Sequence, residues 1–237
     1  MTRPSQRCPV FEFKPRISYR DDLLLPASSY GIRVPAGLSA GSVPAPTYVS
    51  PEQMLALRKS QPQHQAGGGI AITHGLTTAD FALCFSNFQA QWRQVSANAA
   101  VPFWQFQGGD VYFEVTIGVS VLEGNRPDPN DAESRQIFAI LMEHELLHVL
   151  DEIDIVSQWM PSRGYQDQMV RRYLGDAQTV DDSMFRHWFR GTRFQDWLRD
   201  GLWTPEHNRR KDIRDSAAAY APFRQRIEAL RIQQVNR

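Results

Sequence analysis

The sequence has few cysteines and no excess of charge of either sign. Two cysteines in 237 residues are too few for a disulfide scaffold or a cysteine-ligated zinc finger. Lysine plus arginine and aspartate plus glutamate both total 26, so the formal net charge is zero. A protein that binds nucleic acid normally carries a basic excess, and we therefore expect no nucleic-acid partner.

Long hydrophobic runs are also missing from the sequence. No segment approaches the 18 consecutive apolar residues that indicate a membrane-spanning helix, so we expect no membrane span. The first 16 residues, MTRPSQRCPVFEFKPR, contain no continuous apolar stretch of the kind that a Sec signal peptide needs. We therefore expect a protein that is cytoplasmic in the cell that produces it.

Prolines are concentrated near the N-terminus, where nine of the 15 lie within residues 1–62. Proline and glycine disfavour long regular elements, so the composition predicts an N-terminal arm over residues 1–65. The remaining residues, 66–237, are then expected to form one folded domain. An irregular segment that wraps around this domain is the alternative interpretation of the N-terminal residues.

Hydrophobic periodicity predicts the main elements of the domain. The apolar spacing from Thr78 to Val95 favours a helix, whereas the strict alternation from Val111 to Leu122 predicts a strand with one buried face. Asn130 and Glu133 have the spacing of a capping box at the start of a helix that is apolar on nearly all sides. Further helices are expected over residues 164–237, one of them opened by Thr204. The predicted fold class is α+β, mainly helical with a small sheet.

The buried helix contains the segment His144-Glu145-Leu146-Leu147-His148. Two histidines four residues apart project from the same helix face and can hold one metal ion. Glu145 lies about 100° further around the helix, within reach of a water on that ion. Because these polar side chains would be costly to bury without partners, the pattern favours a metal site over a purely structural polar cluster.

This segment resembles the HExxH signature of the zincin metallopeptidases. The resemblance implies that His144 and His148 bind zinc, and that Glu145 is the general base when a zinc-activated water hydrolyses a peptide bond. It also implies that the strand Val111–Leu122 is the edge strand of the sheet and binds extended substrate. A protein or peptide substrate is accordingly the expected partner.

Two downstream carboxylates compete as the third zinc ligand. Asp154 falls at the third-ligand position of the metzincin pattern, although Asp151 replaces the glycine of that pattern and the apolar spacing predicts that the helix continues to about Trp159. Glu206 suits the gluzincin pattern, in which a later helix supplies a glutamate, and His207 beside it would donate a hydrogen bond in the transition state. We favour Glu206, whose alternative role is to stabilise a helix N-terminus.

The short chain with its polar N-terminal residues resembles the compact zincin effectors that bacteria inject into other cells. This resemblance implies a secreted effector or toxin that acts on target-cell proteins, with secretion machinery or a chaperone as a further partner. The alternative is a non-catalytic interaction protein that has a structural or degenerate metal site.

Overall fold

The computed structural model describes residues 10–39, 41, 43–60, 74–85, 93–94, 103–105, 108–163, 180–181 and 192–235. The chain forms two compact units, which are described separately. The first comprises residues 1–16, 81–115 and 154–206, and the second comprises residues 17–80, 116–153 and 207–237. Within the described ranges, no helix has both the length and the apolar character needed to cross a membrane.

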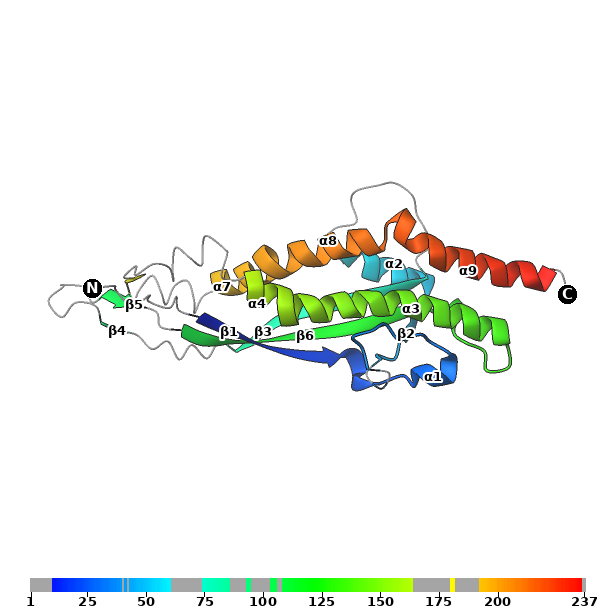
Figure 1. The fold of residues 1–237 in the computed structure, drawn as a ribbon, viewed down its shortest axis with the longest axis horizontal. Coiled ribbons are helices and arrows are strands. Elements are labelled where there is room, and N and C mark those ends of the chain that lie inside the picture. Colours follow the sequence, from blue (N-terminus) through cyan, green and yellow to red (C-terminus); the bar gives the residue numbers. More distant parts are fainter. Residues whose placement is uncertain are drawn as a thin grey trace, which may run out of the picture. The chain divides into compact units, whose positions relative to one another are not determined.

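The main sheet has four strands, with β6 (Gly108–Leu122) at its centre (Figure 1). β6 pairs with β1 (Val10–Tyr19), with β2 (Thr47–Val49) and with β3 (Gly75–Phe85). The alternation in the sequence explains this strand, because every second side chain from Val111 to Val121 is buried. Together with the long helices, this sheet confirms the predicted α+β fold class.

Two predictions about the sheet are wrong. Gly75–Phe85 forms strand β3, although the apolar spacing from Thr78 favours a helix. The segment is rich in β-branched and aromatic residues, and its pairing with β6 decides the outcome over local spacing. The strand over Val111–Leu122 is central rather than an edge strand, because segments from the N-terminal third of the chain pair with it.

The described part of residues 1–65 contains regular elements. Besides β1 and β2, it forms the short helices η1 (Arg20–Asp22), α1 (Ala27–Tyr30) and α2 (Pro51–Ser60). The prolines are compatible with these elements where they stand, as at the first position of α2. The boundary expected at residue 65 lies outside the described residues, so the division into arm and domain stays a prediction.

The first unit contains a cluster of aromatic rings. Phe81 packs against Phe113 and Trp203, with ring centroids 5.3 and 5.8 Å apart, and Phe13 meets Phe113 edge-on. The described helices of this unit are η4 (Ile155–Trp159), α4 (Met160–Arg163), α7 (Thr192–Asp196) and η5 (Trp197–Trp203). A small second sheet joins β4 (Arg93–Gln94), β5 (Phe103–Gln105) and β7 (Val180–Asp181).

The second unit contains the long helix α3 (Ala132–Asp154), preceded by η3 (Glu123–Asn125). Asp131 caps this helix instead of the predicted Asn130, so the helix begins one residue later than expected. The side chain of Asp131 accepts a hydrogen bond from the backbone N–H of Glu133 at 2.9 Å. The backbone then stays helical through Asp154 and η4, so the predicted continuation to Trp159 is confirmed.

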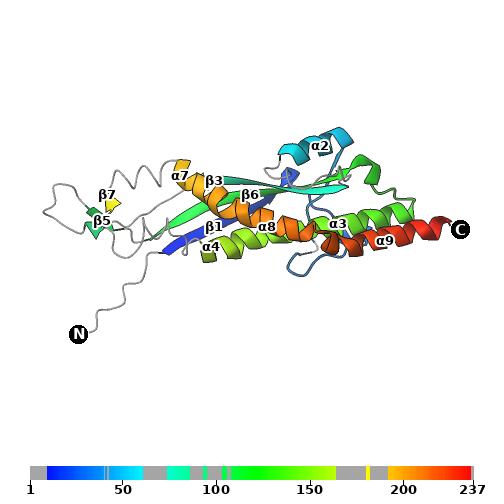
Figure 2. The ribbon, with the colours of Figure 1, turned by 90° about the horizontal axis from the view of Figure 1, so that it is seen from above.

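Two helices from the C-terminal part of the chain lie alongside α3 (Figures 1 and 2). They are α8 (Thr204–Arg214) and α9 (Ala217–Val235). Thr204 does not cap α8, because it has helical torsion angles and η5 runs directly into α8. Asp215 and Ser216 form the turn between α8 and α9, and the side chain of Ser216 accepts a hydrogen bond from Ala219 N–H that caps α9.

Candidate metal centre

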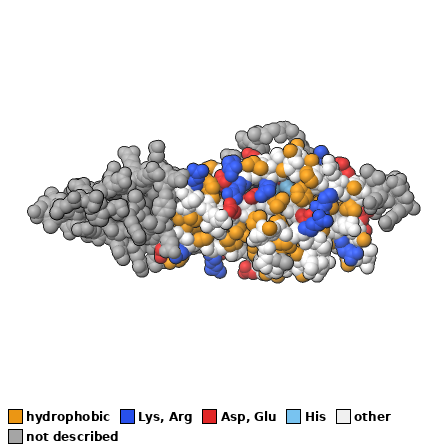
Figure 3. Space-filling model, viewed as in Figure 1, with side chains coloured by type: hydrophobic (Ala, Val, Ile, Leu, Met, Phe, Trp, Pro, Cys, Tyr) orange, Lys and Arg blue, Asp and Glu red, His pale blue; other side chains and the backbone are white. Residues whose placement is uncertain are grey.

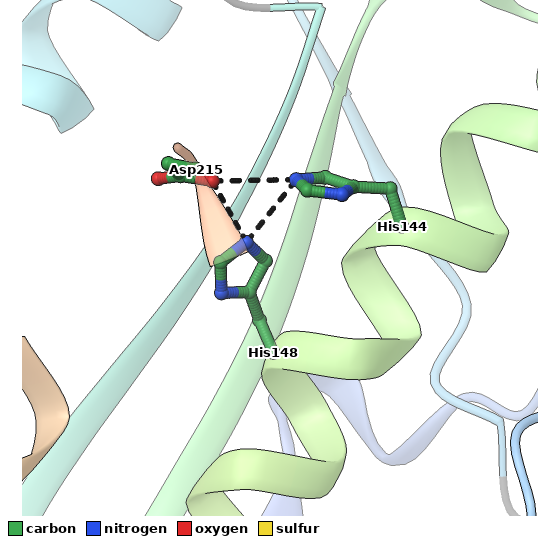
Figure 4. Close-up of side chains that lie close together, drawn as sticks. All are labelled: His144, His148 and Asp215. Carbon is green, nitrogen blue, oxygen red and sulfur yellow. Dashed lines mark hydrogen bonds and ion pairs between the residues drawn. The ribbon is translucent and has the colours of Figure 1, made fainter. Parts of the chain in front are cut away.

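Three side chains of the second unit converge on one point (Figure 4). His144 and His148 come from α3, where their spacing of four residues places both imidazoles on one face. Asp215 comes from the turn between α8 and α9. The two Nε2 atoms lie 3.3 Å apart, and Oδ1 of Asp215 lies 3.3 Å from Nε2 of His144 and 3.1 Å from Nε2 of His148.

The imidazole of His144 is buried and that of His148 is mostly buried, whereas the carboxylate of Asp215 is exposed. The side chains of His144, His148 and Asp215 are 7%, 12% and 42% exposed. On the face shown in Figure 3, a small histidine area lies among hydrophobic, basic and acidic side chains of the described surface. Because Asp215 is 42% exposed, solvent can approach the centre from the side of its carboxylate.

The charges at the centre favour an ionised carboxylate. Burial acts to raise the pKa of Asp215, but the hydrogen bonds with His144 and His148 outweigh it and hold this pKa well below its usual range. Burial acts to lower the pKa of His148, yet the bond to Asp215 and the charges of Glu145 and Asp215 raise it overall. Asp215 is thus an anion at neutral pH, which is the form that binds metals.

Hydrogen bonding accounts for two of the three contacts in this arrangement. Both imidazoles can donate Nε2–H to Oδ1 of Asp215, because a carboxylate oxygen accepts two hydrogen bonds, but the two Nε2 atoms then face each other at 3.3 Å with no hydrogen bond between them. Nδ1 of His144 is buried and has no hydrogen-bond partner among the described residues, whereas a metal-bound histidine usually donates this N–H to an acceptor. A cation placed between the three atoms would receive a lone pair from each of them.

The carboxylate of Glu145 is held against strand β3. The hydroxyl of Thr77 donates a hydrogen bond to Oε2 of Glu145 at 2.7 Å, and both side chains are buried. A Cβ atom added at Gly75 would lie 2.6 Å from Oε1, so a larger residue there would displace the carboxylate from its present position. The charge of Glu145 contributes to the raised pKa of His148, which places this carboxylate within electrostatic range of the centre.

Residues of α8 and α9 complete the surroundings. The rings of Tyr220 and Phe223 meet the ring of His144 edge-on, with centroids 4.9 and 5.1 Å away. Burial raises the pKa of Tyr220, and the charges of Glu145 and Asp215 raise it further. Lys211 lies one helical turn before Asp215, and burial lowers its pKa against the opposing charges of Asp215 and Glu145.

The structure brings together the three residues of the HExxH segment but neither expected third ligand. Asp154 lies six residues beyond His148 on an unbroken helix, about 9 Å further along the axis. Glu206 lies in the first turn of α8, nine residues and about 13 Å before Asp215. The carboxylate that joins the two histidines is Asp215 instead.

The structure also gives His207 a contact other than the expected one. Nδ1 of His207 forms a short hydrogen bond with Glu152, and His207 itself lies eight residues before Asp215 along the chain, so this histidine does not lie beside the pair. Asp151, which replaces the glycine of the metzincin pattern, accepts hydrogen bonds from Arg214. Both residues join α8 to α3.

Asp215 is not predicted from the sequence, because it does not lie at a ligand position that the zincin patterns give after the motif. The one local signal is the Asp215-Ser216 pair, since a capping serine predicts a helix end and hence a polar corner of the chain. Comparison of the chain with protein-family models, with curated proteins and with solved structures finds no match. What the centre can do therefore follows from its own side chains, which form a donor set suited to a divalent metal ion.

Proposed function

We propose that this protein is a zinc-dependent endopeptidase. His144, His148 and Asp215 hold the zinc ion, and Glu145 is the general base. The observation that carries this proposal is the convergence of three metal-binding atoms next to the glutamate of an HExxH segment. Buried imidazoles and an ionised carboxylate are the donors that zinc takes in catalytic sites.

The spacing of the donor atoms supports zinc as the metal. Tetrahedral zinc with bonds of about 2.0–2.1 Å separates its ligand atoms by about 3.3 Å. The three donor atoms are 3.1–3.3 Å apart. Three protein ligands leave a fourth position open, which is typical of catalytic rather than structural zinc. When bound, zinc would polarise a carbonyl group and lower the pKa of water.

The chain's own residues supply the proton transfer and the orientation of the substrate. Glu145 would accept a proton from the attacking water, since it is the glutamate of the HExxH segment, next to the ligand His144 in the chain, and its carboxylate is held by Thr77. We place the substrate backbone along β3 rather than β6, since β3 carries Thr77, which donates to the Glu145 carboxylate, and Gly75, where an added Cβ would meet that carboxylate. An extended segment of a protein is the substrate that suits such a strand.

The biological setting belongs to the same proposal. The polar, proline-rich N-terminal segment and the resemblance to compact zincin effectors support a bacterial effector or toxin. Such a protein is delivered into a target cell by a specialised secretion system. Its partners are then the secretion machinery or a chaperone, and a protein substrate in the target cell.

Glu145→Gln tests the proposed reaction. The amide keeps the shape of the side chain but cannot accept the proton, so hydrolysis of an unfolded protein substrate falls at least about 100-fold. Zinc content, measured by mass spectrometry, stays at the wild-type value because Glu145 is not a ligand. Glu123→Gln, on an exposed side chain, is the matched control and keeps full activity.

Two results would contradict the peptidase proposal. One is a wild-type protein that binds zinc and cleaves no unfolded or native protein offered to it, which would indicate a non-catalytic interaction protein with a structural site. The other is a Glu145→Gln variant that cleaves as fast as the wild type.

A further inference from the structure

Two buried carboxylates of α3 bracket the histidine pair. Glu143 precedes His144 by one residue, and Asp151 follows His148 by three. Glu143 and Asp151 are only 7% and 9% exposed. A buried carboxylate is costly unless a charged or hydrogen-bonding partner satisfies it, so the partners of these two residues matter for the arrangement of the helices.

Asp151 is paired with the residue that immediately precedes Asp215. Nε and Nη2 of Arg214 donate to Oδ2 and Oδ1 of Asp151 at 2.8 and 3.1 Å. Arg210, one turn earlier on α8, lies 3.8 Å from the same carboxylate. A two-pronged arginine–carboxylate contact fixes orientation as well as distance. Because α8 ends at Arg214, this contact sets where the chain turns towards α3.

Glu143 is paired with an arginine on the other side of that turn. Its carboxylate accepts hydrogen bonds from both terminal nitrogens of Arg226 on α9, and a further one from the backbone N–H of Arg33 at 3.3 Å. The two ion pairs therefore hold α8 and α9 against α3 on either side of the turn that carries Asp215.

Packing alone does not hold Asp215 in place. Its side chain is 42% exposed, and it is the one donor of the centre that does not belong to α3. Its distance from the two histidines depends on how the end of α8 and the start of α9 dock against α3. Metal sites bind tightly only when surrounding contacts hold each ligand in place.

We propose that the Asp151–Arg214 and Glu143–Arg226 ion pairs are clamps that position Asp215 as a metal ligand, with Arg214 as the principal positioning residue. This inference rests on the proposed zinc site and goes beyond it, because it assigns roles in metal affinity to residues that do not touch the metal.

Zinc affinity of the full-length chain tests the inference, measured by competition with a chromophoric chelator. Asp151→Asn and Arg214→Gln each weaken zinc binding about 10- to 100-fold, the range typical of residues that support a metal ligand. The double variant binds no more weakly than the worse single variant, because both substitutions break the same contact. Arg214→Lys gives an intermediate affinity, since lysine keeps the charge but loses the two-pronged contact.

Arg224→Gln is the matched control. Arg224 also pairs with a carboxylate, Glu228, but both side chains are more than half exposed and the pair lies within α9. Its loss leaves zinc affinity at the wild-type value. The absorption spectrum of bound Co²⁺ adds a readout that a merely structural role would not change, because it reports how Asp215 binds the metal.

The possible outcomes separate this inference from the proposed function. Wild-type zinc affinity in Asp151→Asn and Arg214→Gln would contradict the proposal that these ion pairs position Asp215, and it would leave the proposed zinc site intact. If either variant fails to fold, Arg214→Lys decides, and wild-type affinity there would also contradict the proposal. Equal weakening by Arg224→Gln contradicts the assignment as well. A wild-type protein that binds no zinc contradicts the proposed function itself.

Discussion

The hydroxyl group of Thr77 on the neighbouring strand β3 holds the carboxylate of Glu145. Thr77→Val keeps the shape of the side chain and removes its hydrogen bonds to Oε2 and to the backbone carbonyl of Glu145. Hydrogen bonds to charged groups contribute about 1.5–3 kcal/mol, so we expect kcat for peptide hydrolysis to fall about tenfold or more. We expect zinc content to stay unchanged, because the contacts that join His144, His148 and Asp215 to one another do not involve Thr77.

Thr78→Val is the control for this prediction, since Thr78 is equally buried but bonds to Arg20 and to the Gly118 carbonyl. Equal losses of kcat in the two variants would contradict a specific role for Thr77. A loss of zinc in Thr77→Val would do the same, because it would indicate a change in the metal centre itself.

At the scale of single residues, the sequence predicts the part of the site whose residues lie close together along the chain. His144, Glu145 and His148 lie within two turns of one helix, so spacing alone indicates their geometry. Asp215 lies 67 residues beyond His148, and it reaches the histidines only because α8 and α9 dock against α3. The spacing of residues in the sequence does not show how these helices dock. The predicted third ligands, Asp154 and Glu206, are therefore carboxylates that lie closer to the motif along the chain.

Among the elements, α3 is the long helix that carries the two histidines, and 12 of its residues are buried. Phe138 shows why its sequence is apolar on nearly all sides, because its ring is fully buried and contacts the rings of Tyr30 and Tyr48. Phe138→Ala leaves a cavity, and we expect the free energy of unfolding in urea to fall by about 3–5 kcal/mol. Leu55→Ala on α2, where leucine is 45% exposed, should change it by no more than about 0.5 kcal/mol.

A loss at Phe138 as small as that at Leu55 would contradict the packing described for α3. The same helix also shows what periodicity can predict, since its burial and its continuation to Trp159 both follow from its apolar pattern. Strand β3 shows the opposite case. Its short apolar run is compatible with a helix as well as a strand, and only pairing with β6 decides between them.

On the scale of the whole molecule, composition and charge exclude classes of protein but do not indicate the metal centre. All its parts lie in the second compact unit, where residues 17–80 supply Gly75 and Thr77, residues 116–153 supply α3, and residues 207–237 supply Asp215. The centre therefore forms only when three distant segments of the chain fold together. This is why a five-residue motif predicts the reaction class but not the complete ligand set.

The zinc content of purified protein, measured by mass spectrometry without an affinity-tag metal, tests the central claim most directly. We expect about one zinc ion per chain in the wild type, and the same content in Asp154→Asn because Asp154 lies too far along α3. Asp215→Ala should lose most of the metal, since it removes one of three protein ligands. Full zinc content in Asp215→Ala, together with a loss in Asp154→Asn, would contradict the ligand set described for this centre.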